Sequence, residues 1–393
     1  MPHQRERSVE MRIQQQRKLW PIIGVLGLRQ VGKSTLLRDR MKIDQYVTLD
    51  DEEVRDETRV SAKNFLARYA GQPLIIDEVQ KEPKLFDALK AAVDRKKIPG
   101  QWLLSGSVAF SSKLGIRESL TGRIGLTHLY PMTLSELHSQ PFNKKKTFNI
   151  TTDFVQKRFR SEDLAQQMFR GGLPVPAFFR DERTRSEYWS NWSDTSIARD
   201  AAKAYGRGFD IEFCYSILNA MGKALVEGEY PSLSFLTGDK RKCKKYIQAL
   251  EDIFILQRWT VDAAGVGNDH WTFGDSGMAY FFAGKKSGAG LQLSIARHAL
   301  INEIYAFLEY NSISYRRNYY KSEKGSVVDF VIDSIPFRVV NESKSTTSFA
   351  YEERALAGAM KALSSNQGFL LAPIEHAYIP KKGIGILPWT FLS

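Results

Sequence analysis

Cysteine is scarce in this chain: only Cys214 and Cys243 occur among 393 residues, far from any CxxC spacing. Two such cysteines form neither a zinc site on their own nor a disulfide framework, which favours a reducing, intracellular setting. No apolar run approaches the roughly 18 residues needed to cross a bilayer. The first residues also lack the apolar stretch of a signal peptide. We therefore expect a soluble cytoplasmic protein with no membrane partner.

The sequence also lacks the motifs of a histidine metal site and of a serine hydrolase. The six histidines show no HxxxH or other ligand spacing, and no serine stands in a GxSxG elbow. A histidine metal site and a serine hydrolase therefore have no support. The remaining composition is globular, with 43% hydrophobic and 25% charged residues, and the length predicts roughly two to three domains.

Positive charge is in excess. Lysine and arginine number 56 against 44 acidic residues, a formal net charge of +12. This balance makes a polyanionic partner plausible, nucleic acid first and an anionic membrane surface second.

Short apolar runs alternate with helical patterns in the first 150 residues. The runs 22–26, 74–76 and 102–104 each end in glycine, acidic or small polar residues, and a helical pattern covers 84–93. Buried parallel strands read as such apolar runs. The alternation predicts an α/β fold with a parallel sheet, flanking helices and right-handed crossovers.

The segment directly after the first predicted strand fits the pattern GxxxxGK[ST]. Its glycines let backbone N–H groups wrap phosphates, and the following helix start favours negative charge. Lys33 should reach the β- and γ-phosphates, and the Ser34 hydroxyl should ligate Mg²⁺. The residues expected to bind ATP are Gly27, Arg29, Gln30, Val31, Gly32, Lys33, Ser34 and Thr35.

Asp77 and Glu78 follow the second predicted strand and supply what phosphoryl transfer still lacks. We expect Asp77 to hold Mg²⁺ through the ion's coordination shell and Glu78 to polarise the attacking water as general base. Ser107, after the third strand, is placed to orient the water or the γ-phosphate. A transition-state arginine is harder to assign: Arg123 is the first choice and Arg199 the second.

These motifs carry a resemblance. The segments 27–37, 49–51, 77–81, 104–107 and 119–123 resemble the AAA-type module of a prokaryotic ATPase family. Gly171-Gly172-Leu173-Pro174, Ala198-Arg199-Asp200 and Gly274-Asp275-Ser276-Gly277 resemble further landmarks of that family, so the likeness spans nearly the whole chain. It implies ATP binding and hydrolysis, a winged-helix region and a C-terminal domain of unknown function with a restriction-endonuclease-like fold.

The expected organisation has five parts. It comprises a lead-in (1–20), an AAA-type P-loop ATPase core (21–150), a helical lid (151–208), a winged-helix-like domain (209–286) and a C-terminal α+β, restriction-endonuclease-like domain (287–393).

A basic helix is expected in the middle domain. Residues 232–237, Gly238 and 239–252 have the pattern of helix, turn and helix, with Asp239 as a cap. A basic helix start after such a turn is where helix-turn-helix proteins meet phosphates and bases. The alternative is that this helix is a solvated basic face on a spacer domain that contacts a neighbouring protein instead of DNA. The DNA-binding candidates are Lys240, Arg241, Lys242, Lys244 and Lys245.

The C-terminal domain carries a D…ExK pattern. Asp329 and Glu342 stand near the ends of neighbouring predicted strands (327–332 and 337–343), with Lys344 beyond, and Glu303 lies on the preceding predicted helix (293–310). Such residues can hold a second Mg²⁺ or Mn²⁺ for phosphodiester cleavage. However, Val328 replaces the usual proline of the motif. The alternative to cleavage is that the four residues form a structural ion-pair cluster, or a DNA-binding cleft without chemistry.

Two classes of function remain open. The first is a DNA-associated Mg²⁺-ATPase whose nucleotide state repositions the nuclease-like domain. The second is a nucleotide-switched signalling or scaffold protein whose nuclease-like fold binds a protein partner. An ATP-regulated nuclease is a third possibility, and a homo-oligomer is compatible with each.

Overall fold

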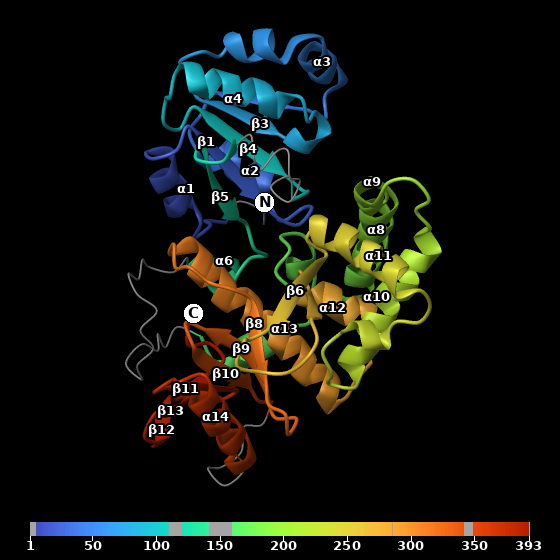
Figure 1. Ribbon diagram of the computed structural model, residues 1–393, viewed down its shortest axis with the longest axis vertical. Coiled ribbons are helices and arrows are strands. Elements are labelled where there is room, and N and C mark those ends of the chain that lie inside the picture. The colour runs from blue at the N-terminus through green and yellow to red at the C-terminus, as the bar shows by residue number, and fades with distance from the viewer. Residues whose placement is uncertain (1–4, 110–119, 141–158, 285, 342–348, 393) are drawn as a thin grey trace.

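The computed structural model describes residues 5–109, 120–140, 159–284, 286–341 and 349–392. An α/β unit forms one end of an elongated molecule and the C-terminal sheet forms the other, with a group of helices beside their junction (Figure 1). Within these ranges, no helix has the length and apolar character needed to span a membrane.

Five parallel strands form the centre of the N-terminal unit. Their spatial order is β2 (Gln45–Thr48), β3 (Leu74–Asp77), β4 (Trp102–Gly106), β1 (Ile22–Leu26) and β5 (Ile124–His128). The three strands predicted from apolar runs are the central three, and each is buried along its whole length. The parallel sheet is thus confirmed. The two edge strands lack a continuous apolar run and were not predicted.

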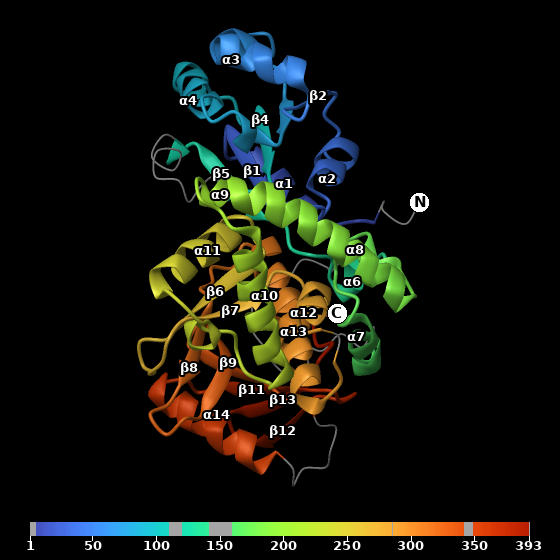
Figure 2. The ribbon, with the colours of Figure 1, turned by 90° about the vertical axis from the view of Figure 1, so that its right-hand side faces the viewer.

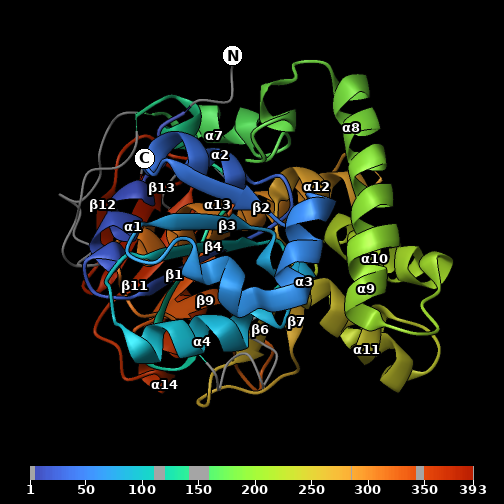
Figure 3. The same cartoon turned by 90° about the horizontal axis from the view of Figure 1, so that it is seen from above.

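Helices cover both faces of this sheet (Figure 3). Ile23 and Val25 of β1 share a core with α1 (Glu10–Arg17) and α2 (Lys33–Arg40). Ile22 and Leu26, on the opposite face, pack with residues of α3 (Glu52–Ala67) and α4 (Leu85–Arg95). The alternation follows from the two-residue period of a strand. It confirms the layered arrangement and the helix predicted over 84–93.

The middle of the chain is mainly helical. A long segment runs across the molecule below the N-terminal unit (Figure 2). It consists of α8 (Glu182–Thr195), the π-helical turn η5 (Ser196–Ala201) and α9 (Ala202–Tyr205). The other elements here are α6 (Leu134–Leu137), α7 (Ser161–Gln167), the short turn η4 (Pro176–Phe178), α10 (Ile211–Val226), α11 (Lys240–Asp252), β6 (Leu256–Val261), β7 (His270–Phe273) and α12 (Ser276–Phe282).

An eight-stranded mixed sheet forms the other end of the molecule. Its order is β12-β13-β11-β10-β9-β8-β6-β7, and β6 pairs in parallel with β8. The hydrogen-bonded sheet therefore crosses position 286, joining the middle hairpin to the C-terminal strands. The C-terminal elements are α13 (Ala289–Tyr310), β8 (Asn318–Lys321), β9 (Val327–Ile332), β10 (Ile335–Val339), α14 (Ala350–Ala362), β11 (Gly368–Ala372), β12 (Tyr378–Lys381) and β13 (Ile384–Pro388).

Two local expectations were wrong. The helix expected over 232–237 is a single 3₁₀ turn, η6 (Leu233–Phe235). The run 337–343 forms a strand only as far as Val339, and 342–348 lie outside the described residues.

Candidate functional site

The loop between β1 and α2 has the backbone of a phosphate-binding loop. Gly32 precedes α2 with φ +102°, a region that favours glycine. A Cβ at Gly27 would lie 2.4 Å from the carbonyl oxygen of Leu129, so only glycine lets the loop pass this neighbour. The motif therefore stands in the strand–loop–helix context that its chemistry needs.

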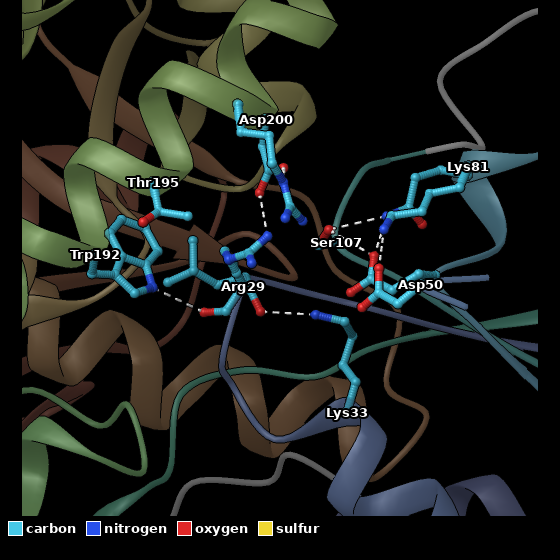
Figure 4. Close-up of polar contacts among 12 residues, drawn as sticks. Arg29, Lys33, Asp50, Lys81, Ser107, Trp192, Thr195 and Asp200 are labelled. Atoms are coloured by element: carbon cyan, nitrogen blue, oxygen red, sulfur yellow. Dashed lines mark hydrogen bonds and ion pairs between the residues drawn. The ribbon is translucent and has the colours of Figure 1, made fainter. Parts of the chain in front are cut away.

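Lys33 is buried and folded back onto its own loop. Its Nζ donates hydrogen bonds to the carbonyl oxygens of Gly27 and Leu28, both at 2.9 Å (Figure 4). Burial lowers the pKa of Lys33 to about 8, against the opposing effect of Glu78 and Asp77. A bound phosphate would further favour the charged form by supplying a compensating negative charge.

Asp77 ends β3 and is held from both neighbouring strands. Tyr46 of β2 donates from its hydroxyl to Oδ2 at 2.6 Å, and Ser105 of β4 donates to Oδ1. The carboxylate is buried at the carboxyl edge of the sheet. Tyr46 and Ser105 were not predicted from the sequence, because they are far from Asp77 along the chain and come close to it only when their strands pair with β3.

Glu78 belongs to a compact polar group with Gln80 and Ser107. Gln80 Nε2 donates to Glu78 Oε2 and, at 3.1 Å, to Ser107 Oγ; Ser107 Oγ lies 3.2 Å from Glu78 Oε2. Glu78 has φ +55°, uncommon for a residue with a side chain. The structure thus brings the predicted base and Ser107 together and adds Gln80, which was not predicted.

A cavity of about 530 Å³ opens over the loop. Gln30, Gly32, Lys33, Ser34 and Thr35 line it, and Glu78 lies at its edge. Further basic residues surround it, so the cavity is suited to a polyanion such as a triphosphate. These are Arg5, Arg7, Arg29 and Arg40.

Arg7 ties the expected lead-in to the phosphate loop. Its guanidinium donates to the carbonyl oxygens of Val31 (3.0 Å) and Tyr130 (2.6 Å), and its Nε lies 3.2 Å from a carboxylate oxygen of Glu136. The arginine is buried. No motif spacing marks Arg7, and only the fold reveals its role.

The helical segment α8–η5 touches the loop directly (Figure 4). Arg29 Nη1 lies 2.9 Å from Asp200 Oδ2, and Trp192 Nε1 donates to the Arg29 carbonyl oxygen at 3.4 Å. Tyr188 donates from its hydroxyl to Gln30 Oε1 at 2.7 Å. Arg199, the second arginine candidate, pairs with the other oxygen of Asp200 at 3.2 Å.

Arg123 does not reach this cavity. It precedes β5, whose register sets Ile124 beside Ile22, the first residue of β1, whereas the phosphate loop follows the last residue of β1. Parallel strands place these two positions at opposite edges of the sheet. Arg123 instead pairs with Asp94 at 2.6 Å. The expectation that Arg123 serves the phosphate site of its own chain was therefore wrong.

The donor chemistry around the loop suits Mg²⁺. Ser34 offers a hydroxyl and Asp77 a buried carboxylate, both hard oxygen ligands of the kind Mg²⁺ takes beside substrate phosphates. Among the described residues, no group of three or more His, Cys, Asp or Glu side chains forms a cage for a metal ion. A P-loop site does not need one, because water and phosphate complete the shell.

Two landmarks of the sequence form one unit beside the cavity. Asp275, the N-cap of α12, accepts hydrogen bonds from the backbone N–H groups of Gly172 (2.7 Å), Leu173 (3.2 Å), Gly277 (2.8 Å) and Met278 (3.1 Å). The next residues after this loop, Pro174 and Val175, line the cavity. Asp275 thus fixes one wall of the phosphate site from a distant helix.

The basic helix is α11, and several of its cations already have partners. Lys240 Nζ donates to the carbonyl oxygens of Leu233 and Leu236. Lys242 and Lys245 lie over aromatic rings, at 4.0 Å from the centroid of Phe213 and 3.8 Å from that of Tyr205. Exposed Arg241 and Lys244 complete the set.

The proposed nuclease carboxylates face different partners. Asp329 is buried, and it pairs with Arg297 at 2.8 Å and accepts from the Tyr230 hydroxyl and the Val339 N–H. Glu303 instead accepts from the backbone N–H of Leu134 at the start of α6, at 2.6 Å. A shared site of Glu303 with Asp329 therefore stays a prediction. Glu342 and Lys344 lie outside the described residues.

Comparison with known proteins gives one family match. Residues 20–138 match the family model described as an AAA domain. Two uncharacterized proteins, Rv2008c of Mycobacterium tuberculosis and Mb2031c of Mycobacterium bovis, are each 24% identical over 372 residues, which is 91% of this chain and 78% of theirs. The Walker-type ATPase PABY2304 of Pyrococcus abyssi aligns over 70% of this chain and 94% of its own at 12% identity, with a TM-score of 0.45.

The N-terminal unit is thus similar to AAA-type P-loop ATPase domains. The match covers the strands, the phosphate loop and the Asp77-Glu78 pair that build the site. Nucleotide binding and hydrolysis is the activity this likeness suggests.

Proposed function

We propose that this protein is a Mg²⁺-dependent ATPase whose nucleotide state is coupled to nucleic acid. The observation that carries the proposal is that Lys33, Ser34 and Glu78 line one basic cavity, with Ser107 bonded to Glu78 behind it. Such a site positions a triphosphate and activates water next to its last phosphate.

Each residue has a role in this proposal. Lys33 leaves its loop carbonyls and contacts the β- and γ-phosphates. Ser34 and Asp77 would hold Mg²⁺, which when bound would supply positive charge beside the phosphates. Glu78 accepts a proton from the attacking water, and Gln80 and Ser107 orient its carboxylate. Arg29, which lines the cavity, is placed to meet the developing charge, and Arg199 reaches it only through their shared partner Asp200.

Two variants test the ATPase proposal. Lys33→Ala should abolish turnover, whereas Glu78→Gln should retain ATP binding and slow hydrolysis by at least about 100-fold. The measurement is single-turnover ATP hydrolysis together with binding of labelled ATP. Unchanged turnover in Lys33→Ala would refute the phosphate site, and loss of binding in Glu78→Gln would assign Glu78 a structural role.

Association with DNA is supported by the net charge of +12 and by basic side chains near the site. The test is Mg²⁺-dependent ATPase activity with and without single-stranded and duplex DNA at moderate salt. Stimulation of several-fold supports coupling to nucleic acid. A basal rate indifferent to DNA favours the second candidate.

The second candidate is a nucleotide-switched scaffold that binds a protein partner. The observation favouring it is the engagement of Asp329 by Arg297 and Tyr230, which leaves this carboxylate committed to internal contacts. In this scheme the C-terminal sheet is a binding surface, and cleavage of nucleic acid is absent. This candidate is distinguished from the first if a protein partner binds in a nucleotide-dependent way and DNA does not stimulate ATPase activity.

A further inference from the structure

A second basic pocket lies beside the catalytic cavity. It has a volume of about 260 Å³ and is formed by α3 and the turn after β3 on one side and by η5 and α9 on the other. Basic side chains line it from both sides: Arg55, Arg59, Lys81, Arg199 and Lys203. No aromatic side chain is among its lining residues in the described part of the chain.

The cations are spaced in a regular way. Arg55 and Arg59 lie one helical turn apart on α3, and Arg199 and Lys203 are four residues apart where η5 passes into α9. Residues four apart occupy one helix face at neighbouring positions. Two pairs of cations from facing helices suit a chain of several phosphates better than a single phosphate group.

The acidic neighbours of these cations are also part of the pocket's charge balance. Arg59 pairs with Asp56 (3.0 Å) and Glu82 (3.1 Å), Lys81 pairs with Asp50, and Arg199 pairs with Asp200. The side chains of Arg59 and Arg199 are 53% and 51% exposed. Their partners Glu82 and Asp200 are only 7% and 12% exposed, so a phosphate would bind the solvent-facing side of each guanidinium while the carboxylate stays paired.

Two buried polar atoms in residues lining the pocket have no hydrogen-bond partner among the described residues. They are Nε of Arg55 and Oε1 of Gln80. Buried polar atoms of this kind are uncommon in a protein on its own. Arg55, at the wall of this pocket, therefore carries a donor that no described residue satisfies.

The pocket is connected to both parts of the ATPase site. Gln80 lines it and also holds Glu78 and Ser107. Asp200 lines it too and pairs with Arg29 of the phosphate loop. A ligand here would therefore contact the neighbours of the catalytic carboxylate and of the loop.

We propose that this pocket binds the sugar-phosphate backbone of a single nucleic-acid strand, without base recognition, and thereby couples it to ATP hydrolysis. The inference rests on the proposed function and locates its nucleic-acid contact at this pocket rather than at α11. Bidentate arginines match phosphate geometry, and the lack of aromatic lining removes the usual platform for stacking bases.

The test uses the full-length protein and a fluorescein-labelled 20-nucleotide DNA strand, with anisotropy measured at several salt concentrations. In Arg59→Glu/Lys203→Glu we expect at least tenfold weaker binding and a salt slope lower by about 1.4, since each phosphate contact contributes about 0.7 for single strands. Basal ATPase activity should stay within twofold, and DNA stimulation should disappear. The matched control, Arg241→Glu/Lys244→Glu on α11, should bind as the wild type does.

A neutral pair, Arg59→Gln/Lys203→Gln, guards against misfolding and should show a smaller loss in the same direction. The inference is overturned if the pocket variants bind like wild type while the α11 control loses affinity, a result that leaves DNA coupling intact. It also fails if polyglutamate or inorganic polyphosphate, at equal concentration of charge, binds more tightly than the DNA strand and displaces it, and if the pocket variants weaken that binding. If wild-type protein binds no DNA, the proposed nucleic-acid coupling itself fails.

Discussion

Arg29 of the phosphate loop and Asp200 of the helical segment η5 form an ion pair of 2.9 Å across 171 positions of sequence. Their side chains are 23% and 12% exposed, so the pair is shielded from solvent more than an ordinary surface contact. Because Arg29 lines the nucleotide cavity, the pair couples the loop that meets phosphate to the helices below it.

Removing the negative charge of Asp200 should strengthen ATP binding. In Asp200→Asn, Arg29 becomes available to phosphate and an anion is lost from the margin of the cavity. We expect roughly fivefold tighter binding, equivalent to about 1 kcal/mol for a partly buried pair. Titration of labelled ATP checks this. Asp194→Asn, on the same helical segment but bonded to Tyr215, is the matched control, and equal affinities in both variants would contradict the coupling.

The pKa of Lys33 predicts how ATP binding depends on pH. Burial lowers this pKa to about 8 in the free protein, and the phosphate-bound state requires the charged amine. Binding therefore takes up a proton above pH 8, and the dissociation constant should rise about tenfold from pH 7 to pH 9. Calorimetry with metal-free ATP at constant ionic strength measures it. Lys33→Arg stays charged and should give a flat profile; parallel profiles would contradict the assignment.

The central strands and the phosphate loop were predictable from sequence because their signals are local. A buried parallel strand is a continuous apolar run, and the loop that follows β1 has a fixed spacing of glycine, lysine and serine. Asp77, Glu78 and Ser107 lie at or directly after the ends of such strands, and Lys33 follows β1 after the six-residue phosphate loop. Their convergence at one edge of the sheet is a consequence of parallel pairing.

The supporting residues were not predictable because they come from distant positions. Arg7 reaches Val31 and Tyr130, and Tyr46 reaches Asp77 from a strand that is half exposed. Arg123 failed for a related reason: its place in sequence, one helix after β4, did not reveal that it starts a strand at the opposite edge. Because β5 has no continuous apolar run and was not predicted, the sequence did not show that Arg123 lies at the amino end of a strand.

Asp275 should be essential for the loop that lines the phosphate cavity. Its carboxylate accepts four backbone hydrogen bonds, and the amide of Asp275→Asn would turn an NH₂ group toward donors that need an acceptor. We expect a loss of about 3 kcal/mol in the free energy of unfolding and weaker ATP binding.

Urea denaturation and ATP titration measure both effects of this change. Asp269→Asn, which breaks an exposed pair with Arg258, is the control and should cost under about 1 kcal/mol. Gly171→Ala provides an independent probe, since its Cβ would lie 2.0 Å from Asp275 Oδ1 and the residue has φ +78°. Wild-type stability in both Asp275→Asn and Gly171→Ala would remove Asp275 from this role.

Asp329 should act as a structural carboxylate. Asp329→Asn leaves the Arg297 guanidinium, which is only 14% exposed, without its buried counter-charge, and breaking a buried pair typically costs about 3–5 kcal/mol. The free energy of unfolding in urea should fall by this amount, whereas Glu323→Gln, an exposed acid in the same domain, should leave it unchanged. Replacing both partners, as in Asp329→Asn/Arg297→Met, should recover part of the loss, because the uncompensated charge is removed.

A catalytic role for Asp329 makes the opposite prediction. A metal-binding carboxylate would gain stability from Mn²⁺ in the wild type, and Asp329→Asn would abolish that gain along with cleavage of plasmid DNA. Asp329 is held by Arg297, Tyr230 and Val339. We therefore expect Mn²⁺ to change the unfolding midpoint of the wild type and of Asp329→Asn by the same amount. A rise confined to the wild type, accompanied by cutting, would establish the nuclease and displace the structural interpretation.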